Sequence, residues 1–390
     1  MRVRSFTLQQ FRSYATLDFA CGAEDVSVLQ GPNAAGKTNL LEALSILSSG
    51  RSFLGAEEDD LITWGHDYYR LRARLLSDAK EEQTIEIVSQ RLPRRARVGF
   101  VNDVRLPISR LTGVLPAVSF LPQDLELFTG SPARRRDLLN DLLVQVSPEF
   151  AASFVSYQKF LKQRNALLRR IREGTGRPQD LAVWEEGLAR EGAVITLSHL
   201  ELLKVLQCTL EEELRALGES WQEVALTYDR HPSARSGSSP LGSARGCDGQ
   251  ATTREGIEAE LAHDLLHFRE RDLLIGSTTI GPHRHDWRID ADGRSLATFA
   301  SRGQQRTAVL ALLFLQVSYM EVRRGEKPLI LLDDVFSELD QAHQERLMTS
   351  LKGHQVFLTT THAVPGISSA TVWEVGGGKV KQGVGLGRGA

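Results

Sequence analysis

Residues 31–38 constrain this chain more than any other stretch, because they fit the pattern G-x-x-x-x-G-K-[ST] in full and follow the apolar run 26–29. The two glycines permit turn geometries that a Cβ would forbid, so successive backbone N–H groups can point at a polyphosphate. The run after Thr38 has helical apolar spacing, and the positive N-terminal end of such a helix favours an anion. We therefore predict a phosphate-binding loop between a strand and a helix.

Individual residues of this loop have distinct expected roles. Lys37 is expected to reach the outer phosphates of ATP, and Thr38 to ligate Mg²⁺ through its hydroxyl. The other residues predicted to surround the nucleotide are Gly31, Pro32, Asn33, Ala34, Ala35, Gly36 and Asn39. Arg12 and Tyr14 lie on a predicted bend near the loop and are candidates for nucleotide contact, the alternative being a surface arginine and a core aromatic.

A second motif stands near the C-terminal end of the chain. The apolar run 328–332 has the pattern of a buried strand and is followed by Asp333 and Asp334. A P-loop ATPase needs carboxylates across from its lysine: Asp333 would hold Mg²⁺, and Asp334 would orient or deprotonate the attacking water. Such a run is weak evidence alone, but a full phosphate-binding loop in the same chain makes it a strong prediction of an ATPase site.

Ser301 and Gly303 precede the apolar run 308–315, which predicts a helix. Free N–H groups at a helix N-terminus attract anions, so this turn, with Arg302 and Gln304, is a second candidate phosphate site. One nucleotide does not need two such phosphate-binding sites from one chain. We therefore expect two chains to face each other, each lending this turn to the γ-phosphate that the other chain holds. The alternative is an ordinary serine-capped helix.

The composition excludes several classes of protein. Hydrophobic residues make up 41% and charged residues 25%, as in ordinary soluble proteins, and three cysteines in no paired spacing suggest neither a disulfide framework nor a zinc site. No apolar window approaches the length of a membrane span, so we expect no membrane partner and a cytoplasmic protein. Because the formal net charge is −2, a nucleic-acid partner must be met by a local patch or by a surface assembled from two chains.

The order of the predicted elements indicates an α/β protein whose ATPase head is interrupted by helices. Alternation predicts strands near 3–11, 14–19, 69–75 and 84–88. A helical period dominates 137–218, with possible breaks at Pro148, 174–176 and Gly192. The predicted division is 1–130 for the N-terminal part of the head, 131–271 for a helical arm with a flexible insertion at about 231–253, 272–375 for the C-terminal part of the head, and 376–390 for a flexible tail.

Two basic segments are candidates for contact with nucleic acid. Four arginines, Arg91, Arg94, Arg95 and Arg97, crowd a predicted hairpin turn, where accessible positive charge could hold phosphates. A solvated hairpin tip is the alternative. The helical arm also has a basic face, although such faces are more often solvated than dedicated to DNA.

These motifs together resemble those of a known family. Residues 31–38, the turn at Ser301, the Asp333-Asp334 pair and residues 337–340 are similar to the ABC-type ATPase heads of the SMC, Rad50 and RecF group. Within that group the similarity is closest to the RecF family, in the stretches 11–14, 31–42, 50–53, 157–168, 281–284, 301–307 and 331–340. The resemblance implies an ABC-type P-loop head assembled from N- and C-terminal segments, with an inserted helical arm domain.

The resemblance also implies a function. RecF proteins act in bacterial recombination and gap repair, so we expect an ATP-dependent homodimer that binds DNA at gaps or single-strand/double-strand junctions. We expect a weak, DNA-dependent ATPase that helps to place the RecA recombinase, with RecR and RecO as partners. Two other classes stay open. A transporter ATPase subunit would need a membrane partner and normally lacks the helical insertion, whereas a non-hydrolysing clamp would bind ATP without releasing phosphate.

Four positions depart from the family pattern or extend it. His285 stands where RecF proteins usually carry the first of two aspartates, and Ala34 stands where a glycine is common. Gln123 replaces a more usual acidic residue; since a glutamine at this bend of ABC heads can sense the γ-phosphate and the metal, it is a candidate catalytic residue. His362 occupies the place of the switch histidine of ABC heads, a role that the RecF pattern does not require.

Overall fold

The computed structural model describes residues 1–230, 253–362 and 370–383, so the predicted flexible insertion lies almost entirely outside the described residues. The chain divides into two compact units. Unit 1 comprises Met1–Leu125 and Leu313–Ala390, and unit 2 comprises Glu126–Leu312. Residues 272–312, which the sequence prediction assigns to the head, therefore fall in unit 2. The functional division of the chain remains a prediction, because compactness alone defines the two units.

Unit 1 contains a sheet in which five parallel strands bring distant parts of the sequence together. Its strand order is β15-β14-β3-β13-β12-β8, and only β15 runs antiparallel to its neighbour. β12 and β13 are buried along their whole length, which explains their continuous apolar sequence. The strands are β3 (Val26–Gln30), β8 (Ala117–Phe120), β12 (Leu329–Asp333), β13 (Val356–Thr360), β14 (Ala370–Gly376) and β15 (Lys379–Gln382).

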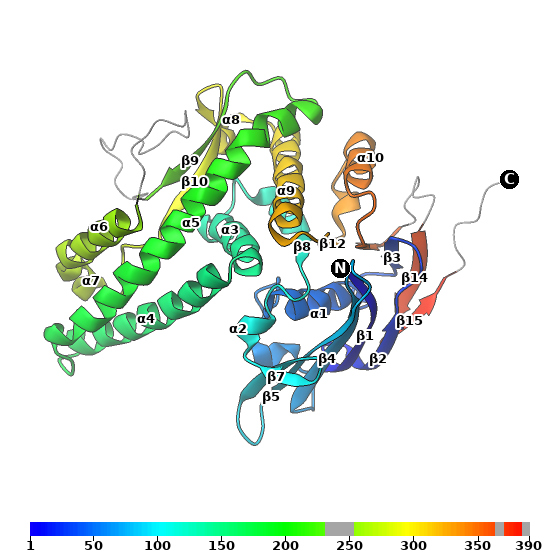
Figure 1. The fold of residues 1–390 in the computed structure, drawn as a ribbon, viewed down its shortest axis with the longest axis horizontal. Helices are drawn as coiled ribbons and strands as arrows, with labels where there is room; N and C mark the ends of the chain where they lie inside the picture. Colours follow the sequence, from blue (N-terminus) through cyan, green and yellow to red (C-terminus); the bar gives the residue numbers. More distant parts are fainter. Residues whose placement is uncertain (231–252, 363–369, 384–390) are drawn as a thin grey trace. The chain divides into compact units, whose positions relative to one another are not determined.

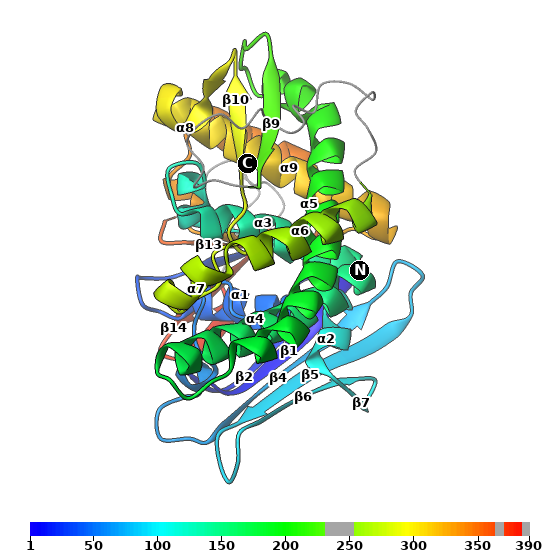
Figure 2. The same cartoon turned by 90° about the vertical axis from the view of Figure 1, so that its left-hand side faces the viewer.

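A second, antiparallel sheet completes the core of unit 1. Its order is β2-β1-β4-β5-β6-β7, and Figure 2 shows these strands side by side. The strands are β1 (Arg2–Phe11), β2 (Tyr14–Ala20), β4 (Tyr68–Leu76), β5 (Glu82–Gln90), β6 (Ala96–Val101) and β7 (Val104–Leu106). Helix α1 (Lys37–Ser49) contacts strands of both sheets, so its apolar residues form the centre of one hydrophobic core. The strands expected from alternation are therefore confirmed.

The short elements of unit 1 are η1 (Glu58–Leu61), α2 (Ile108–Leu111), η2 (Pro122–Glu126), η4 (Val335–Ser337) and α10 (Gln341–Ser350).

The last strand of unit 1, β15, corrects a prediction. The prediction of a flexible tail from residue 376 is wrong for its first part, because β15 pairs with β14. Gly377 and Gly378 have φ angles of 58° and 70°, the left-handed geometry of a tight hairpin turn. Glycines that suggested disorder thus make a turn.

Unit 2 is built mainly from long helices around a small sheet of order β11-β10-β9. Its elements are α3 (Pro132–Val146), α4 (Pro148–Arg172), η3 (Pro178–Asp180), α5 (Leu181–Ala216), β9 (Val224–Asp229), α6 (Arg254–His267), α7 (Arg269–Ile275), β10 (Asp286–Ala291), β11 (Arg294–Ser295) and α8 (Leu296–Phe299). Helix α9 (Arg302–Arg324) begins in unit 2 and ends in unit 1. Figure 1 shows α4 and α5 running alongside each other, and α5 also contacts α6.

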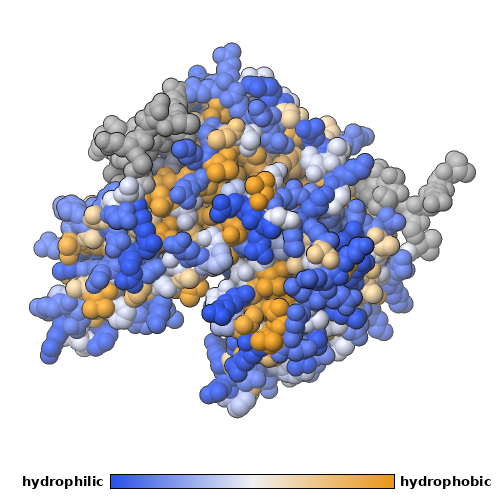
Figure 3. Space-filling model, viewed as in Figure 1, coloured by the Kyte–Doolittle hydropathy of each residue, from blue (hydrophilic) through white to orange (hydrophobic). Residues whose placement is uncertain are grey.

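The expected helix breaks are present at Pro148 and after α4, but the break predicted at Gly192 is wrong. Gly192 lies inside α5, where a Cβ would stand 3.1 Å from Leu261 of α6 and 3.3 Å from Tyr157 of α4. The glycine therefore leaves room for α4 and α6 to pack closely against α5 at this point. Figure 3 shows that hydrophobic residues reach the surface in several patches surrounded by hydrophilic ones.

A buried ion network ties the helices of unit 2 together. The Arg164 guanidinium is fully buried; it donates to Asp272 at 2.6 Å, to Glu185 at 2.9 Å and to the Thr278 hydroxyl at 2.9 Å. Since a buried charge is costly without partners, these bonds lock α4, α5 and α7 in one register. The stretch 157–168, which contains Arg164 and resembles the RecF family, therefore has a structural role.

One helix corrects the expectation that no segment could span a membrane. Among the described residues, Pro178–Ala216 is long and apolar enough by length and composition, with a mean hydropathy of 1.3 over 18 residues. Half of that window is buried inside the protein. The core helix of a protein without any membrane contact passes the same test, so this finding assigns no membrane role.

Candidate nucleotide site

The loop 31–36 connects β3 to α1, and its two glycines are required by their surroundings. At Gly31 a Cβ would lie 2.3 Å from the carbonyl oxygen of Val375. Gly36 caps α1 with a φ of 100°, and a Cβ there would stand 2.9 Å from both the Ser13 and the Tyr14 oxygens. Neither position could carry a side chain without moving the loop backbone.

Lys37 turns back onto its own loop. Its Nζ donates to the carbonyl oxygens of Gly31 at 2.8 Å and of Pro32 at 2.9 Å, which are acceptors that a phosphate oxygen could replace. Burial lowers the pKa of Lys37, and the negative charges of Asp334 and Asp333 oppose that shift. The lysine thus lies beside both carboxylates at the end of β12.

The Thr38 hydroxyl bridges the two motifs. Its Oγ1 donates to the Asp333 carboxylate, with distances of 2.9 Å to Oδ1 and 3.0 Å to Oδ2. Asp333 also accepts a 2.7 Å hydrogen bond from Thr359, which is fully buried at the end of β13. Because β13 lies between β3 and β12, the sheet order itself brings this trio together.

Asp334 is held by its backbone rather than by its side chain. Its φ of 47° is left-handed, and its N–H donates to Thr359 Oγ1 at 2.8 Å. Burial raises the pKa of Asp334; Asp333 and Glu338 act in the same direction, whereas Lys37 and His362 oppose the shift. A carboxyl with a raised pKa beside Lys37 has the properties of a proton acceptor.

The donor set fits a magnesium nucleotide. Among the described residues no group of three or more His, Cys, Asp or Glu side chains could hold a metal ion by itself. A hydroxyl and a carboxylate, Thr38 and Asp333, are the hard oxygen ligands that Mg²⁺ takes when phosphate oxygens complete its shell. Thr38 and Asp333 would supply the protein ligands of such a shell, and they already contact each other at the mouth of the loop.

Arg12 and Tyr14 serve the structure of the site. Tyr14 is fully buried, and its hydroxyl donates to the carbonyl oxygen of Gly36 at 3.1 Å. The Arg12 guanidinium makes two 2.8 Å bonds to Glu42, a fully buried carboxylate on α1. Of the two alternatives, the core aromatic is therefore correct for Tyr14, and Arg12 braces α1. Asn39 donates to the Ser13 hydroxyl at 2.9 Å and so ties the start of α1 to the same bend.

The remaining predicted residues lie at defined places. Gln123 is half-buried in η2, directly after β8, the neighbour of β12. His362 is exposed just after β13 and near enough to Asp334 to affect its pKa. In unit 2, Ser301 and Gln304 form a reciprocal cap: Ser301 Oγ accepts from the Gln304 N–H at 3.2 Å, and Gln304 Oε1 accepts from the Ser301 N–H at 3.0 Å. The residues Ser301, Arg302 and Gly303 are exposed.

Sequence reasoning missed two residues of this site. Thr359 stands in the run Thr359-Thr360-Thr361 after an apolar stretch, and a polar residue at a strand end beside the nucleotide strand could have drawn attention. Glu42 is the one charged residue in the apolar stretch 40–47, which is a signal for a buried partner. Its partner, Arg12, could not be identified from helical spacing because it lies on another element.

The chain matches the family model described as the RecF/RecN/SMC N-terminal domain over residues 2–374. It is 34% identical to the DNA replication and repair protein RecF of Moorella thermoacetica, covering 97% of this chain and 96% of that protein. Identity to the Bacillus subtilis RecF is 32%, over 98% and 99% of the two chains.

Solved structures agree with these matches. A structure of the recombination mediator protein RecF with ATP has a TM-score of 0.84 and 28% identity, covering 98% of this chain and 97% of that one. An SMC head bound to the winged-helix domain of ScpA, at 14% identity and a TM-score of 0.53, shares the fold alone. The α/β fold with an ABC-type ATPase head is thus confirmed, and the chain belongs to the RecF/RecN/SMC family, with RecF proteins as its full-length relatives.

Proposed function

We propose that this chain is an ATP-dependent DNA-binding protein of recombinational repair and replication-gap processing. One observation carries the proposal: the Thr38 hydroxyl lies 2.9 Å from the Asp333 carboxylate, beside Lys37 on the phosphate-binding loop. The relatives' name, DNA replication and repair protein, supports the repair role, and the RecF structures with ATP support ATP as the nucleotide. The enzyme would be a slow, DNA-dependent ATPase in the cytoplasm.

The proposed mechanism begins with an exchange of partners at the loop. Phosphate oxygens replace the carbonyls of Gly31 and Pro32 as acceptors for Lys37, and N–H groups of 31–38 surround the phosphates. Thr38 and Asp333 would hold Mg²⁺, which supplies neutralisation of phosphate charge and alignment of the transferring group. Asp334 accepts the proton of the attacking water, because its raised pKa suits a general base and Thr359 fixes its backbone. Gln123 would contact the γ-phosphate from the end of β8.

We propose further that the site is completed by a second copy of the chain. Ser301, Arg302, Gly303 and Gln304 of the partner subunit would close over the γ-phosphate. Support comes from the exposure of this turn at the N-terminus of α9, a helix of 23 residues whose N-terminal end carries partial positive charge that favours an anion. Because the γ-phosphate is the only group that distinguishes ATP from ADP, closure would report whether ATP is intact.

Sedimentation velocity tests this switch. The chain should sediment as a dimer with Mg²⁺ and ATP and as a monomer with ADP, because a ligand shifts an equilibrium only by its differential affinity. Equal dimerisation with both nucleotides would reject the switch. Dimerisation with ATP but no phosphate release would instead identify a non-hydrolysing clamp.

The DNA substrate is tested separately. We propose gapped DNA or a single-strand/double-strand junction as the target, with RecR and RecO as partners in placing RecA; the words RecFOR pathway in the description of a related structure support the two partners. A gel-shift titration at stated salt, on gapped, single-stranded and duplex DNA with and without ATP, should show tightest binding to the gapped substrate with ATP. Equal affinity for all three would reject the gap preference.

A further inference from the structure

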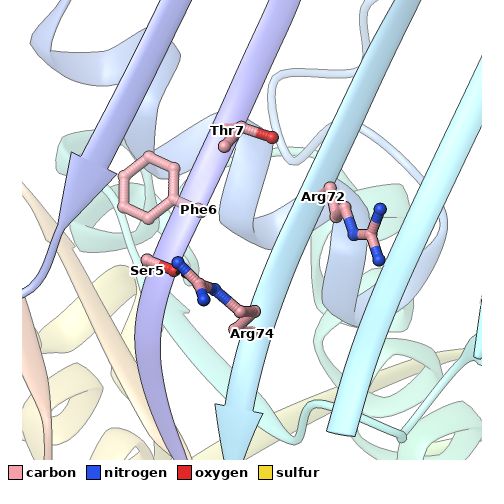
Figure 4. A pocket seen from close by; sticks show the side chains of 5 residues that line it. All are labelled: Ser5, Phe6, Thr7, Arg72 and Arg74. Atoms are coloured by element: carbon pink, nitrogen blue, oxygen red, sulfur yellow. Dashed lines mark hydrogen bonds between the residues drawn. The ribbon is translucent and has the colours of Figure 1, made fainter. Parts of the chain in front are cut away.

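The outer face of the antiparallel sheet of unit 1 carries a basic hollow that the nucleotide site does not use. The hollow has a volume of about 290 Å³. Figure 4 shows its lining residues, which come from two neighbouring strands: Ser5, Phe6 and Thr7 of β1, and Arg72 and Arg74 of β4. No acidic residue is among them.

The sequence pattern of β4 produces this face. Leu71, Ala73 and Leu75 point into the hydrophobic core, so the alternating arginines Arg70, Arg72 and Arg74 stand on the opposite side of the sheet. Across the ladder, Arg74 pairs with Ser5 and Arg72 pairs with Thr7, which places each guanidinium-bearing residue beside a hydroxyl. Phe6 stacks on Phe19 at 4.7 Å in the core, so its ring does not fill the hollow.

The two arginines differ in how firmly they are held. Arg74 donates from Nε to the Ser5 hydroxyl at 3.0 Å and has no carboxylate partner within the described part of the chain. Arg72 extends towards β5, where it pairs with Glu86 at 3.6 Å and with Asp103 at 3.2 Å. With 40% of the Arg72 side chain and 81% of the Asp103 side chain exposed, the Arg72–Asp103 pair is weak, and another anion can replace Asp103. Glu86 is less exposed, at 13%, and is the stronger competitor for Arg72.

We propose that the outer face of β1 and β4 binds the phosphate backbone of single-stranded DNA, with Arg74 and Ser5 holding one phosphate and Arg72 and Thr7 the next. Residues two apart on a strand are separated by about 6.7 Å, which is comparable with the spacing of neighbouring phosphates along one nucleic-acid strand. Guanidinium groups and hydroxyls are the usual donors to phosphate oxygens. This inference rests on the proposed function, because it names the surface that such a DNA-binding protein would use.

Charge and shape favour this occupant over two others. A protein partner needs apolar anchors that become buried, and the one apolar residue that lines the hollow, Phe6, already has its ring in the core. The line from Arg70 to Arg74 runs about 13 Å along a straight strand. An unpaired strand can follow that line, whereas the backbone of a duplex winds away from it.

The test uses a double variant that carries both Arg72→Gln and Arg74→Gln. Its binding to a single-stranded oligonucleotide is compared with that of wild type by fluorescence titration, with ATP and at several salt concentrations. Loss of two phosphate contacts should lower the salt slope by about 1.4 and weaken binding about 25-fold at 0.1 M salt. Glu86→Gln, which removes the half-buried carboxylate 3.6 Å from Arg72, should act in the opposite direction and strengthen binding about five-fold.

Arg110→Gln is the matched control. It removes the same charge from an exposed position on α2, a helix that packs through Leu111 against Gly99 on the core side of the same sheet. Its binding should equal that of wild type, and all variants should keep the wild-type melting temperature and ATP affinity.

The outcomes separate this inference from the proposed function. If wild type binds DNA but the double variant binds single strands with unchanged affinity and salt slope, the inference alone is wrong. A loss confined to duplex DNA would also overturn it. If wild type binds no DNA under any condition, the proposed function fails and the inference falls with it.

Discussion

Replacing Thr359 by valine should destabilise unit 1 and weaken its hold on magnesium. The Thr359 hydroxyl donates to Asp333 at 2.7 Å and accepts from the Asp334 N–H at 2.8 Å, and the residue is fully buried. Valine keeps the shape but removes both bonds. A hydrogen bond to a charged group contributes about 1.5–3 kcal/mol, and an unsatisfied buried N–H costs about 1–3 kcal/mol. We therefore expect a loss of about 3 kcal/mol in the free energy of unfolding.

Thr359→Ser is the matched control, because it keeps the hydroxyl and removes only a methyl group. Its expected cost is about 1 kcal/mol. Differential scanning calorimetry should place the valine variant several degrees below the serine variant, at about 2–4 °C per kcal/mol for a unit of this size. Similar melting temperatures for the two variants would show that the hydroxyl does not hold the strand ends.

Nucleotide binding gives the second readout for the same pair of variants. Residues that orient a metal ligand typically affect metal affinity 10–100-fold when they are removed. The Mg²⁺ concentration needed for half-maximal nucleotide binding should therefore rise about ten-fold in Thr359→Val and stay unchanged in Thr359→Ser. An unchanged Mg²⁺ requirement in both variants would contradict the role of Thr359 in positioning Asp333.

Three further predictions concern other parts of the chain. Arg164→Ala removes the guanidinium from the buried Asp272 and leaves Glu185 with Arg269 as its ion partner, so it should cost about 3 kcal/mol in urea unfolding. The exposed Arg172→Ala should cost less than about 1 kcal/mol, and equal costs would contradict the network. Burial raises the pKa of Asp334, so its protonated carboxyl is favoured in the folded chain. The contribution of this carboxyl to the free energy of unfolding is fully present below pH about 3.9 and is lost as the pH rises through the raised pKa. Urea unfolding at each pH should therefore show that Asp334→Asn gains stability relative to wild type as the pH rises through this range. The same variant should bind ATP but lose ATPase turnover. Normal turnover would reject Asp334 as the general base. Ala34 has a φ of 63°, so Ala34→Gly should relieve left-handed strain and stabilise the chain by up to about 1 kcal/mol in thermal melts, and a lower melting temperature would contradict this.

Much of the nucleotide site could be predicted from sequence because each part is local. The loop around Lys37 and the strand that ends at Asp333 both carry short patterns whose chemistry depends on backbone geometry. The alternation in β4 likewise separates core residues from arginines without knowledge of the fold. What sequence could not give was the pairing that joins these parts, since β13 lies between β3 and β12 only in the folded sheet.

The misses have physical reasons of the same kind. The expectation that glycine marks a break or disorder is wrong at Gly192, which permits close helix packing, and at Gly377, which makes a hairpin turn. Both functions depend on what lies across from the glycine, which local patterns do not contain. The pairing of Arg12 with the buried Glu42 was likewise beyond local patterns, because it joins two elements far apart in sequence.

Mixing two inactive variants tests most directly whether the ATP site is shared between two chains. Lys37→Ala removes the phosphate-binding lysine, and Gly303→Asp places a negative charge where the partner's γ-phosphate would lie. The second change should keep the fold, because the nearest atom to a Cβ at Gly303 is 3.8 Å away. Each variant alone should lack ATPase activity.

In an equimolar mixture, half of the dimers should contain both variants, and each of these has one intact site formed by Lys37 of one chain and Gly303 of the other. The mixture should therefore regain about a quarter of wild-type ATPase activity. Activity that stays at the level of the separate variants at every mixing ratio would contradict a site shared between two chains.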